Sequence, residues 1–176
     1  VLSIHGDQLT LDDVERFLET ERLEVRLSPA ARNAVQKSRD AIERILATGR
    51  TVYGINTGFG KLSSKAIGPA DLAVLQRNLL VSHAVGVGKP LDIAVARLAM
   101  LLRTNALARG YSGIRLEVLE RLLDLLNLGI TPVIPEQGSV GASGDLAPLA
   151  HMAIVLIGEG EAFVGGRRMP AKEALA

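Results

Sequence analysis

The sequence of 176 residues contains no cysteine and no tryptophan, and aromatic residues make up only 3% of it. Without cysteine there can be no disulfide framework and no cysteine-based zinc or iron–sulfur site. The three histidines, His5, His83 and His151, are far apart and form no HExxH pair, so we expect no metal cofactor. The apolar residues are mostly Leu, Ala, Val and Ile, which favours packed helices over an aromatic-rich sandwich.

An excess of charge of one sign is also missing. Twenty Lys and Arg residues oppose 19 Asp and Glu residues, which leaves a formal charge of +1. We therefore expect no nucleic-acid partner, because such a partner requires a concentrated basic excess. The longest apolar run, 152–157, is far shorter than the ~20 residues of a membrane span, and no basic-then-apolar leader opens the chain. These features predict a soluble, cytoplasmic protein that binds no membrane.

Helix caps, glycines and prolines divide the chain into mainly helical elements. We expect a short strand at 1–5 and a β-hairpin at 162–169, broken at Gly165-Gly166. The chain then ends in the opening turn of a further helix, so we expect residue 176 to be a truncation point. Apolar spacing with start and stop signals predicts six helices, at 11–21, 29–48, 71–82, 91–109, 115–127 and 145–157.

Individual residues mark the ends of these helices. Thr10 and Ser28 are N-cap candidates, and Gly49 is expected to close the second helix in the left-handed conformation. The first helix has one apolar face, and the helix at 115–127 is leucine-rich and stops at Gly129. Pro132 and Pro135 predict an extended passage, whereas Pro148 is tolerable because it lies in the first turn of its helix.

Two glycine-rich segments, 50–68 and 138–145, have no helical period and are typical of functional loops. Neither matches a nucleotide-binding motif. A P-loop would need Ser or Thr after Gly60-Lys61, but Leu62 follows. The nucleophile elbow GxSxG also fails, because Gly144 stands one place too early. We therefore expect no nucleotide cofactor.

The tripeptide Ala142-Ser143-Gly144 permits an unusual reaction within the second loop. If the Gly144 nitrogen is forced onto the carbonyl carbon of Ala142, a five-membered ring can close. Loss of one water from the ring and one from the Ser143 side chain leaves a methylene conjugated to an imidazolone, which is an electrophile. Gly144 allows the close approach because it lacks a β-carbon. From the tripeptide alone, a flexible turn before a helix is the alternative.

Longer motifs around both loops resemble one family. Residues 138–151, GSVGASGDLAPLAH, resemble the prosthetic-group signature of the aromatic amino-acid ammonia-lyases and aminomutases. Residues 53–60, YGINTGFG, resemble the tyrosine loop of the same family. The resemblance covers essentially the whole chain but only the N-terminal part of the family's protein. It implies that residues 1–176 form a single N-terminal helical domain of the ammonia-lyase (fumarase/aspartase-like) fold, with the C-terminal remainder absent.

The resemblance implies a role for each residue of the ring. Ala142, Ser143 and Gly144 would form a methylidene-imidazolone autocatalytically, and this electrophile would capture the substrate amine and make it a better leaving group. Asp145 would be either a simple helix-start carboxylate or a group that assists cyclisation. The predicted helix beginning near Asp145 would direct the positive end of its dipole at the ring and raise its electrophilicity.

The tyrosine loop and the histidines complete the predicted site. By resemblance Tyr53 is the general base, and Asn56 and Gly60 shape the loop around it. A structural tyrosine is the alternative for Tyr53. His83 would contact the substrate ring, the alternative being a hydrogen-bonded histidine at a helix end. We interpret His151, on an apolar helix, as a satisfied core histidine, and His5 as a surface residue.

The pair Ser82-His83 indicates the substrate. Residues 75–86 resemble the histidine-specific members of the family, in which this pair occupies the ring-selecting position. The resemblance therefore implies conversion of L-histidine to trans-urocanate and ammonia by a cytoplasmic homotetramer whose active sites draw on several subunits. Two alternatives remain open: a tyrosine or phenylalanine ammonia-lyase or aminomutase, and a structural or assembly fragment that is catalytically silent and keeps residues 142–144 as an ordinary tripeptide.

Overall fold

The computed structural model describes residues 1–20, 23–57, 68–140 and 146–176, which form seven helices and seven short strands. The helices are α1 (Leu11–Glu19), α2 (Pro29–Ala47), α3 (Pro69–His83), α4 (Ile93–Ala108), α5 (Leu116–Leu128), α6 (Leu146–Val155) and α7 (Ala171–Ala174). The strands are β1 (Leu2–Ile4), β2 (Val25–Leu27), β3 (Val87–Pro90), β4 (Ile130–Pro132), β5 (Pro135–Gln137), β6 (Glu161–Val164) and β7 (Arg167–Pro170). Each of the six predicted helices is present, with both ends within two residues of the prediction, so the mainly helical class is confirmed.

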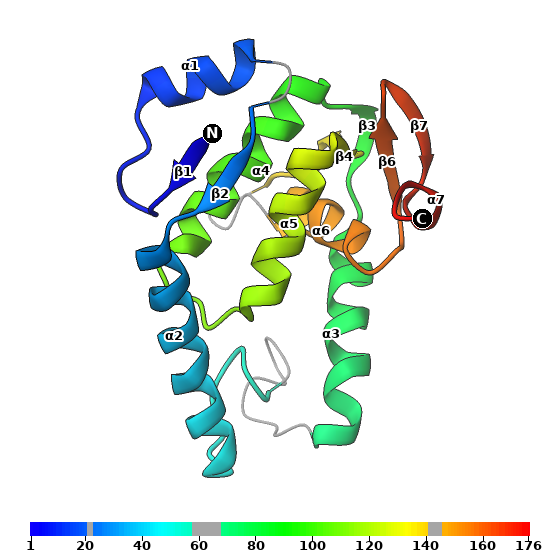
Figure 1. The fold of residues 1–176 in the computed structure, drawn as a ribbon. Coiled ribbons are helices and arrows are strands. Elements are labelled where there is room, and N and C mark those ends of the chain that lie inside the picture. The colour runs from blue at the N-terminus through cyan, green and yellow to red at the C-terminus, as the bar shows by residue number, and fades with distance from the viewer. Residues whose placement is uncertain (21–22, 58–67, 141–145) are drawn as a thin grey trace.

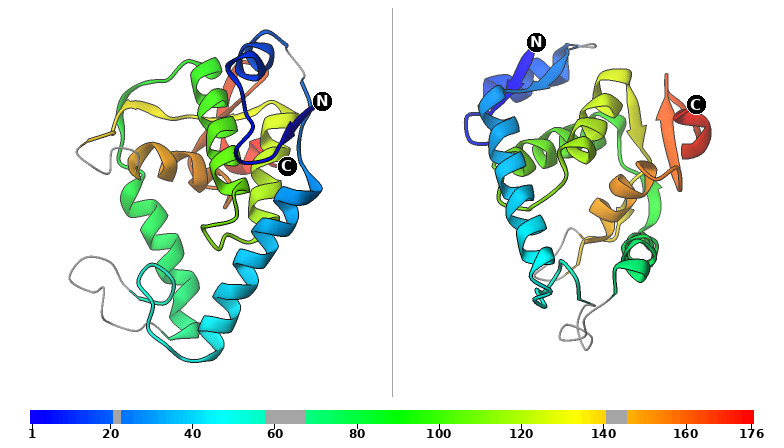
Figure 2. Two further views of the ribbon diagram at one scale, coloured as in Figure 1. Left: turned by 90° about the vertical axis from the view of Figure 1, so that its left-hand side faces the viewer. Right: turned by 60° about the horizontal axis from the view of Figure 1, so that its bottom comes forward.

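Helices α4 and α5 lie at the centre of the molecule (Figure 1). Helices α2 and α3 extend from this centre on two sides, and their far ends lie at the same end of the molecule in all three views (Figures 1 and 2). The central helices carry much of the core, as the leucine-rich pattern predicts. Buried core residues on α4 and α5 include Met100, Leu101, Leu107, Leu119, Leu122, Leu123, Leu125 and Leu126, and Leu98 packs against them.

The N-terminal strand pairs with a second strand that the sequence analysis missed. Strand β1 lies parallel to β2, with Leu2 opposite Val25 and Ile4 opposite Leu27. Asn127 at the end of α5 pairs with the other edge of β2: its Oδ1 accepts a hydrogen bond from the Val25 N–H at 2.8 Å, and its Nδ2 donates to the Val25 carbonyl at 2.9 Å. A three-residue strand offers too short a period to be recognised, and its partners are distant in sequence.

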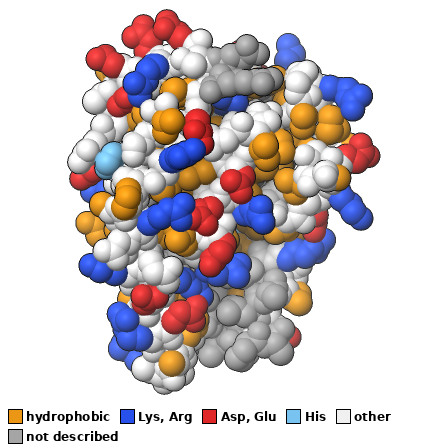
Figure 3. Space-filling model, in the orientation of Figure 1, with side chains coloured by type: hydrophobic (Ala, Val, Ile, Leu, Met, Phe, Trp, Pro, Cys, Tyr) orange, Lys and Arg blue, Asp and Glu red, His pale blue; other side chains and the backbone are white. Residues whose placement is uncertain are grey.

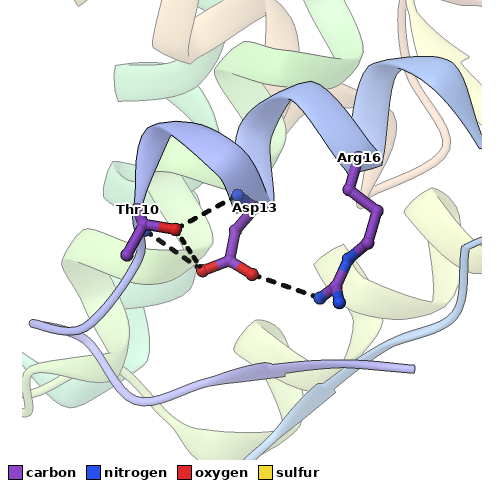
Figure 4. Close-up of polar contacts among 3 residues, drawn as sticks. All are labelled: Thr10, Asp13 and Arg16. Carbon is purple, nitrogen blue, oxygen red and sulfur yellow. Dashed lines mark hydrogen bonds and ion pairs between the residues drawn. The ribbon is translucent and has the colours of Figure 1, made fainter.

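Helix α1 begins at the predicted cap. The hydroxyl of Thr10 accepts a hydrogen bond from the Asp13 N–H at 3.2 Å, and the Asp13 carboxylate accepts one from the Thr10 N–H, which forms a capping box (Figure 4). Arg16 pairs with the same carboxylate at 3.1 Å (Figure 4). Hydrogen bonds from Thr10 hold the pKa of Asp13 below its usual range. Of the apolar face expected here only Phe17 is buried, beneath the Arg97 guanidinium, whereas Leu11 is 85% exposed.

The remaining strands form two small sheets. Strand β3 pairs antiparallel with β5, and β4, β6 and β7 form an antiparallel sheet in that order. The predicted hairpin is β6–β7, and both turn residues, Gly165 and Gly166, have positive φ, as a two-residue turn with right-handed strand twist requires. The passage through Pro132 and Pro135 is extended, as expected, and supplies β4 and β5.

Glycine at position 110 is required for a close approach of two backbones. Gly110 follows α4 with φ of +73°, and a Cβ placed on it would lie 2.5 Å from the carbonyl carbon and oxygen of Ala34 in α2. Gly49, the predicted left-handed residue after α2, has a similar φ of +69° but nothing within 4 Å of such a Cβ. The two glycines thus separate the effect of backbone conformation from that of packing.

We predict that Gly110→Ala lowers the free energy of unfolding more than Gly49→Ala does. Both substitutions strain the left-handed backbone, at about 1–2 kcal/mol, but only Gly110→Ala adds a steric overlap with α2, worth about a further 1–3 kcal/mol. Urea denaturation of the two variants beside the unsubstituted protein measures the difference. Equal losses would contradict the close packing of α2 against the end of α4.

Candidate active site

The described part of the tyrosine loop, 50–57, is closed by hydrogen bonds within itself. The Asn56 side chain spans it: Oδ1 accepts from the Val52 N–H at 2.8 Å, and Nδ2 donates to the Arg50 carbonyl at 2.9 Å. The N–H groups of Ile55 and Asn56 both donate to the Val52 carbonyl, at 3.1 and 3.3 Å. These bonds fix a tight turn between Val52 and Asn56, with Tyr53 within it.

Tyr53 is presented on the outside of this turn. The residue is 63% exposed, and the next residue, Gly54, has φ of +77°, a conformation that glycine adopts readily. The Gly54 N–H donates to the hydroxyl of buried Thr57 at 3.3 Å, which anchors the far side of the turn. The loop therefore holds its backbone firmly while directing a large phenol outward.

His83 is the last residue of α3 and is half-buried. Its Nδ1 lies 2.8 Å from the Leu79 carbonyl oxygen. Because a carbonyl oxygen only accepts, the proton of this hydrogen bond must be on Nδ1, and in the neutral imidazole Nε2 then carries the acceptor lone pair. Ser82 also donates to the Leu79 carbonyl, at 3.0 Å. The helix end thus fixes the ring of His83 and its tautomer.

His151 on α6 makes the hydrogen bond expected of a satisfied histidine. Its Nε2 accepts a hydrogen bond from the N–H of Gly86 at 3.0 Å. Gly86 follows His83 by three residues. Burial lowers the pKa of the His151 imidazole, which favours the neutral form that this bond requires. His5 is exposed, as predicted.

The residues of the predicted ring, with two supporting residues, lie outside the described part of the chain: Ala142, Ser143, Gly144, Asp145 and Gly60. Both flanks of the ring segment are described. Gly138 follows β5, and α6 begins at Leu146 with Pro148 in its first turn, as predicted. A Cβ placed on Gly138 would lie 3.1 Å from Ala147 Cβ and 3.2 Å from Gly86 Cα. The two flanks therefore meet beside the segment that follows His83.

The structure brings His83 close to the flanks of the Ala-Ser-Gly segment but leaves the tyrosine loop elsewhere. Residues 50–57 lie near the N-terminal end of α3, whereas His83 ends that helix (Figures 1 and 2). A helix of 15 residues is about 20 Å long at ~1.5 Å per residue. The described part of the tyrosine loop and His83 therefore lie towards opposite ends of α3.

The rest of the described surface shows no second candidate active site. Basic and acidic side chains are interspersed on the face that Figure 3 shows. A cavity of about 320 Å³ lies where the loop after β1 meets α2 and the end of α4, and its lining includes Asp7 and Arg109 but neither Tyr53 nor His83. Within the described ranges, no three His, Cys, Asp or Glu side chains are grouped to hold a metal ion. Among the described helices, none is both long and apolar enough to cross a membrane.

Comparison with known proteins decides the family. The sequence profile of the aromatic amino acid lyases matches residues 9–176. The chain belongs to the aromatic amino acid lyase family. The resemblance of its two loop motifs is thereby confirmed, and so is the expectation of a mainly helical part of this fold.

Individual relatives extend this result. Histidine ammonia-lyase of Myxococcus xanthus is 56% identical over 172 residues, which cover 98% of this chain and 34% of the relative. The crystal structure of histidine ammonia-lyase from Trypanosoma cruzi superposes with a TM-score of 0.91 at 38% identity, covering 99% of this chain and 34% of that one. The crystal structure of ergothionase from Treponema denticola superposes with a TM-score of 0.92 at 35% identity, covering 98% of this chain and 34% of that one. The chain spans about a third of the length of the curated relatives it matches.

We predict that Asn56→Ala opens the tyrosine loop. Loss of the Oδ1 acceptor leaves the Val52 N–H without its partner, so hydrogen–deuterium exchange at residue 52 accelerates about fivefold, the equivalent of about 1 kcal/mol. Asn56→Asp is the matched control, because its carboxylate still accepts from Val52 while the bond to Arg50 is lost. Unchanged exchange at residue 52 in the Ala variant would show that Asn56 does not hold this turn.

Proposed function

We propose that this chain is the N-terminal domain of a histidine ammonia-lyase, which converts L-histidine to trans-urocanate and ammonia. The observation that carries the proposal is the 56% identity to a histidine ammonia-lyase, together with Ser82-His83 at the ring-selecting position.

The residues present fit a methylidene-imidazolone, which would form from Ala142, Ser143 and Gly144. Ala142 is small, Ser143 provides a hydroxyl that can leave, and Gly144 lacks a β-carbon. The flanks fit as well, because Gly138 lies against Ala147 and Gly86 so closely that a Cβ on it would make contacts of 3.1 and 3.2 Å. Strained backbone persists only where the surroundings enforce it, and these contacts provide an anchor on each side. When formed, the group supplies an electrophile for the substrate amine.

The first turn of α6 adds an electrostatic contribution. The helix begins directly after this segment, and its N–H groups give that end a partial positive charge. An electron-poor environment at residues 142–144 favours attack by an amine. Pro148 does not weaken this helix, because a proline in the first turn removes no intrahelical hydrogen bond.

Tyr53 is proposed to remove the β-proton of the substrate. A phenol with the ordinary pKa of about 10 is a poor base at neutral pH, so the assembled site must favour the phenolate. Within the closed turn around Asn56, Tyr53 remains 63% exposed, so a second copy can cover it. This geometry agrees with a base that acts in a site shared between copies.

His83 is proposed to select the substrate ring. Its Nε2 carries a lone pair because Nδ1 donates to Leu79, so it recognises a ring that offers a hydrogen-bond donor. An imidazole N–H satisfies this requirement, whereas the phenyl ring of phenylalanine has no donor. A site built around such a bond rejects an analogue that lacks the donor, because the acceptor is then left without a partner.

We further propose a cytoplasmic homotetramer, as the family resemblance implies. Since one copy separates Tyr53 from His83 along α3, a complete site requires residues from different copies. Exposed valines on and after α3, at Val74, Val81 and Val85, offer apolar surface for such contacts.

The substrate is tested directly. We predict that the full-length protein forms urocanate from L-histidine, detected by its ultraviolet absorbance, with a higher kcat/KM than for L-tyrosine or L-phenylalanine. The acceptor on His83 is the physical reason for rejecting L-phenylalanine, whereas the expectation against L-tyrosine rests on the resemblance of the Ser82-His83 pair to the histidine-specific members. Preference for either of the other two amino acids would exclude histidine as the substrate and favour a tyrosine- or phenylalanine-specific enzyme.

Two variants test the prosthetic group and the general base independently of each other. We predict that Ser143→Ala abolishes activity and removes the two-water deficit in the intact mass, because no neighbour can supply the methylene. Tyr53→Phe should lose about 10²–10⁴-fold in kcat yet remain two waters light. The fold serves as a common control, monitored by far-ultraviolet circular dichroism. Near-normal turnover in Ser143→Ala would rule out the ring.

A further inference from the structure

Gly86 lies at a junction of three segments. Its N–H donates to His151 Nε2 on α6 at 3.0 Å. A Cβ placed on it would lie 3.1 Å from His151 Nε2, 3.2 Å from Pro135 Cβ and 3.3 Å from the Gln137 carbonyl oxygen. The backbone between α3 and β3 is therefore pressed against both α6 and β5, at the only kind of residue that allows this approach.

The flanks of the Ala-Ser-Gly segment meet at the same place. Gly138 precedes the segment and Ala147 follows it, and Gly138 lies against both Ala147 and the backbone of Gly86, as described above. We call Gly86, Gly138, Ala147 and His151 the Gly86 cluster. Through this cluster the part of the chain that carries His83 touches both ends of the part that carries residues 142–144.

Within the cluster, the bond from Gly86 to His151 is the directional contact. The contacts of Gly138 and Ala147 are apolar and fix no orientation, whereas a hydrogen bond prefers a defined distance and angle. The bond needs a neutral imidazole with its proton on Nδ1, because Nε2 must accept. Burial of His151 lowers its pKa and so favours this form at neutral pH.

We propose that His151 is a positioning residue, which sets the location of the backbone that follows His83 relative to α6 and β5 through its hydrogen bond to Gly86. The inference rests on the proposed function and extends it to a residue outside the predicted site. His151 does not touch the substrate. It holds the segment that carries the ring-binding side chain against the two elements that flank residues 142–144.

The test uses the full-length protein with three substitutions at one position. In His151→Gln the amide oxygen can reach the position of Nε2 and accept from Gly86. His151→Asn keeps an amide but is too short, and His151→Leu keeps the volume without an acceptor. We expect kcat for L-histidine within about threefold of wild type for Gln, and a loss of about 10–100-fold for Asn and Leu, the scale of a misplaced reacting group.

A double-variant cycle separates positioning from general destabilisation. In a His83→Ala background, His151→Asn should cause little further loss in kcat, because His151 acts through His83; a structural effect would persist. Each variant is also checked for the two-water mass deficit, so that a failure to form the ring is recognised. If His151→Asn does not fold, His151→Leu and Gly86→Ala, whose methyl group disrupts the same bond, replace it in the cycle.

The outcomes are distinguishable. Wild-type protein that does not deaminate L-histidine would overturn the proposed function and the inference with it. Active wild type with equal kcat in the Gln and Asn variants would overturn the inference alone, as would a full additional loss in the His83→Ala background. Rescue by Gln together with a lost effect in that background supports the assignment.

Discussion

Burial of apolar surface between α4 and α5 is the interaction on which the other elements depend. Five leucines of α5 and a row of small and large apolar residues on α4 form a large part of the core. Strands β1 and β2 cover one side of this pair, and β4 continues directly from α5 towards the β6–β7 hairpin. The described candidate site residues, Tyr53, Asn56 and His83, are absent from this core. The core therefore supports the site and is not part of it.

The candidate site residues are instead held by local polar bonds. Asn56 closes the tyrosine loop, Leu79 fixes the ring of His83, and His151 holds the backbone at Gly86. A hydrogen bond fixes direction, whereas apolar packing fixes mainly volume. In the proposed site shared between copies, such bonds would orient each residue before the copies meet.

Much of this architecture could be predicted from the sequence, for identifiable reasons. Thr10, Ser28 and Gly129 act where caps and left-handed glycines are expected, and apolar spacing locates the helices between such signals. Strand β2 could not be predicted, since its definition depends on Leu2 and Asn127, which are distant in sequence. The identity of the site came from resemblance to a family. The structure adds the tautomer of His83 and the partner of His151, and no local pattern encodes either of them.

The two histidines near the flanks of the Ala-Ser-Gly segment use their ring nitrogens in the same way for opposite reasons. Nδ1 of His83 donates to a carbonyl oxygen, whereas His151 carries its proton on Nδ1 because its Nε2 must accept from an amide. In the neutral form of each ring, the nitrogen that the fold engages determines the character of the other. In the proposed function, Nε2 of neutral His83 is an acceptor, so the substrate ring must bring the donor. The main chain of α3, through the Leu79 carbonyl, would then contribute to the choice of substrate without touching it.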